Sequence, residues 1–393
     1  MEDFLYDAHC HLSPFFKDES VQKINKALKD NYGNGDNKII PIPTINLMST
    51  TQWDIQFVNR ISLENPSIVQ PCFGIHPWYS HLFTMEDYSK EAIGYQLSET
   101  EIKTQHYSKI FTCMKKGKNE ERDSDSLPDL LLDNLPVPKN LFELIKEIEL
   151  MIEENIRNKE DYEFMIGEIG LDKLFRIPWN GYLGNENEGL INPNSKFNPS
   201  SKFSNYQVSL NHQVIIYKEF LKMAIKYNKP VSIHCVKAHG ILFDTTKSMI
   251  KVKDSKCTKL CLHSYSGSID QAKSWLKLYN KNIFFSISEI LNIKGGTRKE
   301  KEIDGNEYAV DSKCIELLKF LPFENILIET DYGLDFMYLE KNPENQETVE
   351  KNEHLDYLKN TREVILSTKS LQDHYEYTKS EIYGNWINFR KSE

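Results

Sequence analysis

The chain has 393 residues, with 58 acidic and 48 basic side chains, and a formal net charge of −10 at pH 7. This length suits one α/β barrel, which routinely uses about 250 residues or more, or two or three average domains. The acidic balance excludes the broad basic surface of a non-specific nucleic-acid binder, so any contact with phosphate has to be local.

Cysteine usage and the first residues indicate a reduced compartment. The seven cysteines are scattered, and no CxxC pair occurs. The opening residues, MEDFLYDAHC, lack the basic region and long apolar stretch of a signal peptide, and no segment reaches the about 20 apolar residues of a membrane span. We therefore expect a cytoplasmic or nuclear protein with no membrane partner.

The first predicted strand carries a pair of histidines. An apolar stretch, Phe4-Leu5-Tyr6, leads into Asp7-Ala8-His9-Cys10-His11. Side chains alternate between the faces of a strand, so His9 and His11 point the same way and lie about 6–7 Å apart. Two imidazoles on one side of a strand end form half of a metal site.

Eight short apolar runs recur along the chain, most of them rich in Ile, Val and Phe. They are Phe4–Ala8, Lys38–Asn46, Ile68–Gly74, Phe164–Leu171, Pro230–Val236, Lys259–Tyr265, Asn282–Ser288 and Asn325–Asp331. Such continuous runs predict strands of a parallel sheet that is buried on both faces. Helical patterns lie between several of them, most clearly over Leu141–Ile156 and Val208–Tyr227. The alternation predicts a (β/α)8 TIM-type barrel, with a doubly wound open sheet as the alternative.

Long polar stretches interrupt this pattern. The charged run Lys115–Ser126 lies within an expected insertion at about 82–160, and Asn180–Ser204, rich in Asn, Gly, Ser and Pro, lies within a second at about 178–205. Strand-like runs resume after each of them, so we expect a single domain over residues 1–393 with two loop insertions. A third polar run, Lys341–His354, follows the last predicted strand.

Residues suited to metal binding end successive predicted strands. They are His9 and His11 on the first strand, Glu168 on the fourth, His234 on the fifth, His263 on the sixth and Asp331 on the eighth. In a barrel these positions converge at the carboxyl-terminal mouth, where barrel active sites lie. Four histidines and two carboxylates can hold two divalent ions, with one carboxylate between them. His76 ends the third strand and can orient a substrate phosphate or ligate weakly.

In this order, these residues resemble the TatD family of metal-dependent deoxyribonucleases, within the amidohydrolase-like barrels. The matching motifs are Asp7-x-His9-x-His11, Gly74-x-His76-Pro77, Gly167-Glu168-x-Gly170-Leu171-Asp172, Pro230-Val231-x-x-His234, His263-x-Tyr265-x-Gly267 and Glu329-Thr330-Asp331. The likeness extends from Asp7 to about Phe389. The insertions and the sequence Val236-Lys237-Ala238-His239-Gly240 resemble the fungal branch of this family, which is related to a mitotic protein that interacts with the anaphase complex.

The resemblance implies a metal-dependent phosphodiester hydrolase with 3′-to-5′ exonuclease character on single-stranded DNA or RNA. It implies two divalent ions (Mg²⁺, Mn²⁺ or Zn²⁺) and a catalytic pair, Asp331 and Glu168. We expect His9, His11 and Asp331 to hold one ion, His234 and His263 to hold the other, and Glu168 to bridge them. Asp331 would also accept the proton of the attacking water. His76, Lys237 and His239 are the expected contacts to the substrate phosphate.

Three positions depart from the family pattern. Trp78 stands where the family often has His, Val236 where it usually has Arg, and Tyr332-Gly333 where the bacterial pattern runs Ala-Pro. All expected metal-ligand positions are kept, so the departures concern how phosphate is held.

Two other functions are open on the sequence. The barrel can serve as a platform that binds a protein partner through its insertions. Alternatively, it can hydrolyse an amide or lactone, although many such barrels place a modified Lys where this chain has Glu168. The remaining histidines have structural explanations: we expect His212, with Gln213, to pack or to support the site, and His81, His106, His354 and His374 to lie on the surface.

Overall fold

The fold is described from a computed structural model. The description covers residues 5–32, 45–114, 127–185, 202–251, 258–295, 310–341, 348–350 and 353–391. The run Lys115–Ser126 and the greater part of Asn180–Ser204 lie outside the described residues, as does much of Lys341–His354.

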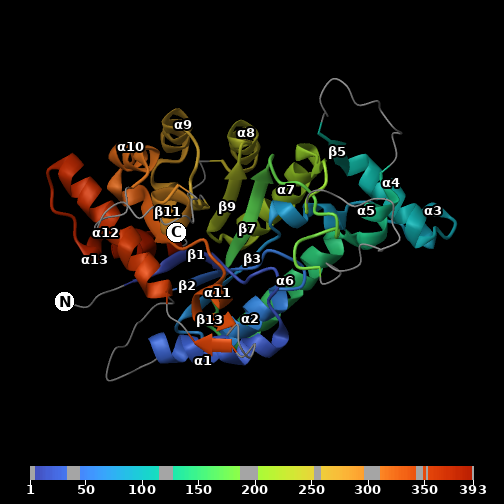
Figure 1. The fold of residues 1–393 in the computed structure, drawn as a ribbon, viewed down its shortest axis with the longest axis horizontal. Helices are drawn as coiled ribbons and strands as arrows, with labels where there is room; N and C mark the ends of the chain where they lie inside the picture. Colours follow the sequence, from blue (N-terminus) through green and yellow to red (C-terminus); the bar gives the residue numbers. More distant parts are fainter. Residues whose placement is uncertain are drawn as a thin grey trace.

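In the described part of the chain, eight parallel strands form one sheet in the order β1-β2-β3-β7-β9-β10-β11-β12 (Figure 1). They are β1 (Asp7–His11), β2 (Ile45–Met48), β3 (Val69–Phe73), β7 (Met165–Asp172), β9 (Val231–Val236), β10 (Leu260–Leu262), β11 (Ile283–Ser288) and β12 (Ile326–Glu329). Each coincides with or overlaps one predicted run. β1 begins three residues later than Phe4, so His9 and His11 lie within the strand.

The sheet closes into a barrel because its two end strands meet. The amide of Asp331 donates to the carbonyl of His9 at 2.9 Å, and the amide of His11 donates to the carbonyl of Tyr332 at 3.3 Å. The open-sheet alternative is therefore wrong, and the predicted TIM-type barrel is confirmed.

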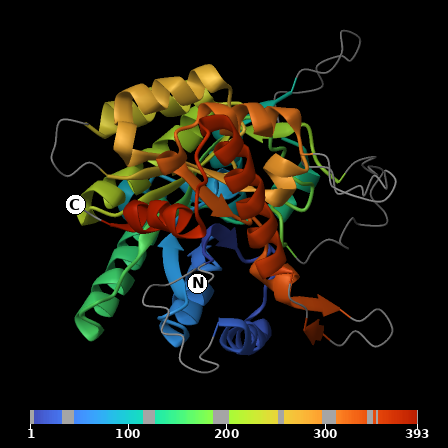
Figure 2. The ribbon, with the colours of Figure 1, turned by 90° about the vertical axis from the view of Figure 1, so that its left-hand side faces the viewer.

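Most helices cover the outside of the barrel, whereas the first three between β3 and β7 extend to one side of it (Figures 1 and 2). The α-helices of the described residues are α1 (Val21–Tyr32), α2 (Ile55–Glu64), α3 (Lys90–Ile93), α4 (Glu99–Ile110), α5 (Asp129–Asn134), α6 (Leu141–Asn158), α7 (Leu210–Tyr227), α8 (His239–Met249), α9 (Ile269–Tyr279), α10 (Ser312–Phe320), α11 (Leu334–Tyr338), α12 (His354–Asp373) and α13 (Lys379–Arg390). Within the part that the structure describes, no helix is both long and apolar enough to cross a membrane.

The core has the two-sided burial that the sequence pattern predicts. Every residue of β7 is buried, and α6 and α7 turn their apolar faces toward the sheet, with Leu144 and Ile148 of α6 and Phe220 of α7 all buried. At the C-terminal end, α12 and α13 cross the face of β11 and β12 (Figure 2). There Trp386 of α13 stacks on Tyr6 with ring centroids 4.8 Å apart.

A buried carboxylate fastens the closing strands. Asp7 is fully buried and accepts hydrogen bonds from the amide of His9 at 3.1 Å and from the amide and hydroxyl of Thr330 at 3.0 and 2.6 Å. Nε2 of His354, also fully buried, lies 2.8 Å from the same carboxylate. Asp7 therefore joins β1, β12 and α12.

The segments between β3 and β7 and between β7 and α7 pack against each other. Strand β5 (Phe111–Cys113) pairs antiparallel with β8 (Tyr206–Val208). A small apolar cluster, separate from the barrel core, includes Tyr107, Leu131 and Ile177. Short strands β4 (Phe83–Thr84) and β6 (Lys139–Asn140) pair beside it, whereas β13 (Leu339–Lys341) and β14 (Thr348–Glu350) form a hairpin after β12.

Three histidines that were expected on the surface are buried, so that prediction was wrong for them. Nε2 of His81 lies 3.0 Å from the carbonyl of Gly181, and Nε2 of His106 lies 2.9 Å from the carbonyl of His81. His354 belongs to the Asp7 network, where Nδ1 lies 2.7 Å from the hydroxyl of Tyr32. Contacts with segments distant in sequence, such as Gly181 for His81 and Tyr32 for His354, help to bury these rings, whereas His374 is exposed as predicted.

Removing the Asp7 carboxylate should destabilise the barrel strongly. Asp7→Ala leaves the buried His354 ring and the amide of Thr330 without their acceptor, and breaking a buried pair in this way typically costs about 3–5 kcal/mol. The control Asp18→Ala removes an exposed partner of Arg60 and should cost less than about 1 kcal/mol. Urea unfolding measures both free energies, and equal values for the two variants would contradict the role of Asp7.

The stability of the protein should fall as the pH falls from about 6.5 toward 4. Burial lowers the pKa of His81 to about 3 and that of His106 to about 4, whereas both rings titrate near 6.5 in the unfolded chain. The unfolded state therefore binds more protons in this window, and acid favours unfolding. A His81→Gln/His106→Gln variant should show a shallower loss of unfolding free energy between pH 7 and 5. The exposed control His374→Gln should keep the wild-type slope, and an unchanged slope in the double variant would refute this origin.

Candidate metal centre

The centre of the barrel mouth is the carboxylate of Glu168, which is only 2% exposed. Among the described residues, ring nitrogens of four histidines surround it. His263 and His76 lie 2.8 and 3.1 Å from Oε1, His234 lies 3.1 Å from Oε1, and His9 lies 3.2 Å from Oε2. Histidines from four other strands thus converge on the carboxylate that β7 carries.

The close approach of β7 and β9 makes this convergence possible. Gly170 adopts a φ of +153°, and a Cβ placed there would lie 2.0 Å from the carbonyl oxygen of His234. Any side chain at this position would push the strands apart. From the other side, the amide of Glu168 donates to the carbonyl of Ser49 after β2 at 3.1 Å.

Asp331 faces Glu168 from the end of β12. Its carboxylate lies 3.6 Å from Nδ1 of His263, 3.8 Å from Nε2 of His9 and 3.9 Å from Nε2 of His11. The structure therefore brings all six predicted metal-binding residues into one cluster at the mouth, although they come from both ends of the sequence.

Within the described residues, the potential ligand atoms that lie within 4.8 Å of one another form two groups. One group is His9, His263 and Glu329, and the other is His76, Glu168 and His234. The sequence-based prediction pairs His263 with His234 around the second ion. In the structure His263 also lies beside His9, and the two stacked rings are 3.9 Å apart.

Glu329 was missed by the sequence analysis. It is fully buried, and its Oε1 accepts hydrogen bonds from the amide and hydroxyl of Ser264 at 2.6 and 2.7 Å. Burial raises its pKa to about 8, with His263 opposing and Asp331 adding to the rise. A signal was present: Glu329 precedes Asp331 by two residues and so shares its direction if the strand alternation continues.

Hydrogen bonds determine which ring nitrogen can face a metal. Nδ1 of His11 lies 3.0 Å from the carbonyl of Leu12, which holds a proton there and leaves Nε2 with a lone pair toward Asp331. In His76, Nδ1 accepts the amide N–H of Trp78 at 3.1 Å, so the neutral ring carries its proton on Nε2. His76 is therefore arranged as a donor toward Glu168 or a bound anion. Burial lowers its pKa to about 4, which keeps it neutral at pH 7.

Asp172 holds His234 from the side away from Glu168. Its Oδ2 lies 3.3 Å from Nε2 of His234 and accepts the indole N–H of Trp78 at 2.7 Å. The side chain of Gln213 brackets the backbone of Asp172 with hydrogen bonds at 2.8 and 2.9 Å, which confirms its supporting role. Desolvation opposes ionisation of Asp172, but the hydrogen bond to His234 and those from Trp78 and Leu174 hold its pKa well below the ordinary value.

The other expected substrate contacts lie beside this site. Lys237 follows β9, is exposed and has a φ of +54°. His239 begins α8, is 8% exposed and packs edge-on against Tyr265, with ring centroids 5.6 Å apart. Lys237 is thus exposed just after β9, whereas His239 lies largely beneath the surface.

The residues present fit divalent metal ions. Desolvation raises the pKa of Glu168, yet His76, His263 and His9 together hold that pKa well below the ordinary value. The pKa of His263 is raised to about 10, because Glu168 and Asp331 outweigh the cost of burial. Nδ1 of His263 and Oε2 of Glu329 are buried without a hydrogen-bond partner. A cation that replaces the proton on His263 gains lone pairs from these clustered imidazoles and carboxylates, which are the donor set that Zn²⁺, Mn²⁺ and similar ions take.

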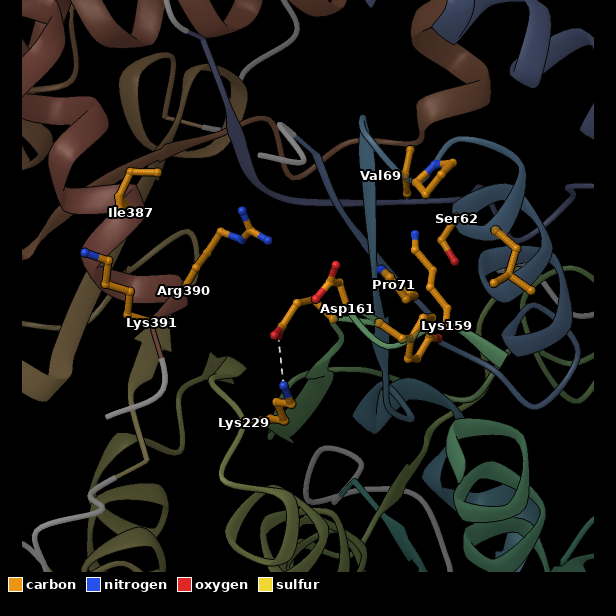
Figure 3. Close-up of a pocket in the computed structure, with 13 residues that line it drawn as sticks. Ser62, Val69, Pro71, Lys159, Asp161, Lys229, Ile387, Arg390 and Lys391 are labelled. Atoms are coloured by element: carbon orange, nitrogen blue, oxygen red, sulfur yellow. Dashed lines mark hydrogen bonds and ion pairs between the residues drawn. The ribbon is translucent and has the colours of Figure 1, made fainter. Parts of the chain in front are cut away.

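A cavity of about 580 Å³ lies at the opposite end of the barrel (Figure 3). Its lining includes Val69 at the start of β3, and Lys229, paired with Glu163 at 2.8 Å, ahead of β9. Arg390 and Lys391 line it from the C-terminal end of α13, where basic side chains offset the negative end of a helix. This cavity is therefore remote from the carboxylate cluster, and its cations have a structural explanation.

Comparisons with known proteins agree on one family. The family model of TatD-related DNases matches residues 6–378. The "Uncharacterized deoxyribonuclease YMR262W" of Saccharomyces cerevisiae is 32% identical over 317 residues, which cover 79% of this chain and 80% of that protein. The "Cut9-interacting protein scn1" of Schizosaccharomyces pombe is 29% identical over 356 residues, 84% of this chain and 86% of that protein. The crystal structure of a TatD family hydrolase from Entamoeba histolytica covers 99% of both chains with a TM-score of 0.51 and 15% identity.

Asp172→Asn should weaken metal binding without unfolding the protein. The amide keeps the size of the side chain but loses the charge that orients His234, and such losses beside a ligand typically cost about 10–100-fold in metal affinity. Calorimetric titration of the metal-free protein with Mn²⁺ measures the change. The control Asp244→Asn removes an exposed carboxylate from α8 and should bind as the wild type does. Equal affinities for both variants would show that His234 does not depend on Asp172.

Proposed function

The chain belongs to the family of TatD-related DNases, hydrolases of phosphodiester bonds, and we propose that it removes nucleotides from the 3′ end of single-stranded DNA or RNA with the help of two divalent ions. The observation that carries the proposal is the buried Glu168 carboxylate among the rings of His9, His76, His234 and His263. A buried acid in this surrounding suits a ligand between two cations.

We assign the ligands as the sequence predicts. His9, His11 and Asp331 would hold one ion, His234 and His263 would hold the other, and Glu168 would serve both. His263 can belong to either group, since its ring stacks on His9 while its Nε2 lies 3.2 Å from Nδ1 of His234. Two divalent ions would supply an activated water and positive charge that stabilises the attacked phosphate. Glu329, beside His9 and His263, is a further donor on the side of the first ion.

The chain's own groups complete the reaction. Asp331 accepts the proton of the attacking water. Its carboxylate lies at the mouth among the expected ligands, 3.6–3.9 Å from the nearest ring nitrogens, and so lies beside the place of the attacking water. His76 donates Nε2–H to a phosphate oxygen, which its Trp78 contact prepares it to do. The exposed Lys237 adds a positive charge after β9 and contacts the substrate phosphate. His239, at the start of α8, is the second phosphate contact on this side of the mouth.

A second function is favoured by one observation. The name of the fission-yeast relative states an interaction with Cut9, so a protein-binding role for this chain, through the segments between β3 and α7, is the alternative. The two functions are compatible, since a barrel can bind a partner while its mouth keeps its ligands.

Asp331→Asn should lower nuclease activity by about 10²–10⁴-fold, the usual contribution of a positioned proton acceptor. The assay follows shortening of a 5′-labelled single-stranded oligonucleotide with Mn²⁺ or Mg²⁺. Wild type should shorten it from the 3′ end, and EDTA should abolish the reaction. The matched control Asp244→Asn should stay within about twofold of the wild type, as exposed substitutions usually do.

Two outcomes would contradict the proposal. Full activity in Asp331→Asn would refute the role of that residue as proton acceptor. Wild type that binds metal, measured by elemental analysis, yet releases no nucleotide from any single strand would refute the nuclease proposal and favour the protein-binding role.

A further inference from the structure

Two aromatic rings from different loops stack at the mouth of the barrel. The rings of Trp53 and Tyr182 lie 4.7 Å apart at an interplanar angle of 23°. Trp53 follows β2 and Tyr182 follows β7, so both are on loops at the carboxyl ends of strands, the end at which Glu168 and Asp331 lie. Although Tyr182 covers one side of the indole, Trp53 remains 43% exposed.

The turn that carries Trp53 is fastened to the metal centre. The carbonyl of Ser49 accepts the amide of Glu168 at 3.1 Å, and the carbonyl of Thr50 accepts the amide of His76 at 2.9 Å. The carboxylate of Asp54 then folds the turn back by accepting the amides of Thr50 and Thr51 at 3.0–3.1 Å. The turn that presents Trp53 is therefore held by the same backbone that supports two residues of the centre, and the stack on Tyr182 orients its ring.

The loop that carries Tyr182 is fixed as well. The side chains of Asn180 and Asn185 donate to each other's backbone carbonyls at 3.2 and 2.6 Å on either side of it. Gly184 has a φ of +87°, and a Cβ there would lie 2.0 Å from the carbonyl of Pro14. The loop thus packs tightly against the segment that follows His11, and the stacked pair borders the mouth on the side of β1 and β2.

We propose that the Trp53–Tyr182 stack is a platform for an unpaired nucleobase of the strand whose phosphate lies at the metal centre. The proposal rests on the nuclease function above and names a contact of its substrate. A flat, exposed and rigid ring beside a phosphate-processing site suits stacking with a base, which is worth about 1–3 kcal/mol per base in single-strand binding and tolerates any sequence.

Charge strengthens the argument for stacking. The chain carries a net charge of −10, so it gains little from long-range attraction of a polyanion. Lys173 and Lys237, exposed after β7 and β9, offer local positive charge at the mouth. An uncharged stacking contact supplies affinity that does not depend on phosphate neutralisation. A base within a duplex has both faces covered, so the platform selects single strands or frayed ends.

The test compares binding of two strands. Asp331→Asn protein with Mn²⁺ is titrated with a 5′-fluorescein oligothymidylate, and with the same strand whose three 3′-terminal nucleotides are abasic. Adding Trp53→Ala should raise the Kd of the normal strand by about 5- to 150-fold, the equivalent of one lost stack. The abasic strand should bind both proteins within about twofold, because it has no terminal base to stack. Trp53→Phe should keep most of the affinity for the normal strand.

Tyr95→Ala is the matched control, since Tyr95 is an aromatic residue 60% exposed and lies between α3 and α4. It should change neither Kd. An unchanged Kd for the normal strand in Trp53→Ala, or an equal loss on the abasic strand, would overturn the platform. A loss that is equally large on a blunt duplex would refute the selection of unpaired bases. If the wild type shortens strands while Trp53→Ala binds them normally, this inference alone fails. If the wild type shortens no strand, the nuclease proposal fails instead.

Discussion

The fully buried carboxylate of Asp7 is the interaction on which the rest of the structure depends. It accepts hydrogen bonds from the backbone beside the first histidine ligands and from Thr330, next to Asp331. Its partner His354 lies 347 residues away in sequence. These contacts join the first and last strands where the barrel closes, and the same closure makes His9, His11 and Asp331 neighbours. Without closure the mouth would have ligands on two separate edges of a sheet.

The mouth is held together by electrostatics that favour a cation. Glu168 lies in a place where desolvation opposes its charge, and the rings around it oppose that cost. The rings also repel one another when charged: burial, and next the neighbouring His263, lowers the pKa of His9. Divalent ions at this site would relieve both problems at once, because they would take lone pairs from the imidazoles and neutralise the carboxylates. Asp172 and Ser232 hold His234 and His9 from behind, through contacts of 3.3 and 2.7 Å to their ring nitrogens.

The loops add what the strands cannot. The strand ends supply a compact set of donors, but recognition of a substrate needs groups that extend beyond the mouth. The turn of Trp53 and the loop of Tyr182 extend beyond the strand ends. Hydrogen bonds from the amides of Glu168 and His76 hold the turn of Trp53 at a fixed place beside the centre. Trp78, which departs from the family pattern, is part of the site. Its indole N–H donates to Asp172, and its ring stacks on Phe175 with ring centroids 4.8 Å apart.

Local pattern was enough to predict the strands and the six residues that meet at the mouth, because strand alternation and the parallel order of strand ends are properties of short segments. It favoured a barrel over an open sheet but did not decide between them, which took the hydrogen bonds between β1 and the segment after β12. What only the tertiary structure decided is which partner each group meets. The proton on Nε2 of His76 follows from its contact with Trp78, the elevated pKa of Glu329 from its burial beside Asp331, and the burial of His81, His106 and His354 from distant segments. Burial and hydrogen-bond partners are set by residues far apart in the chain, and no short pattern in the sequence carries that information.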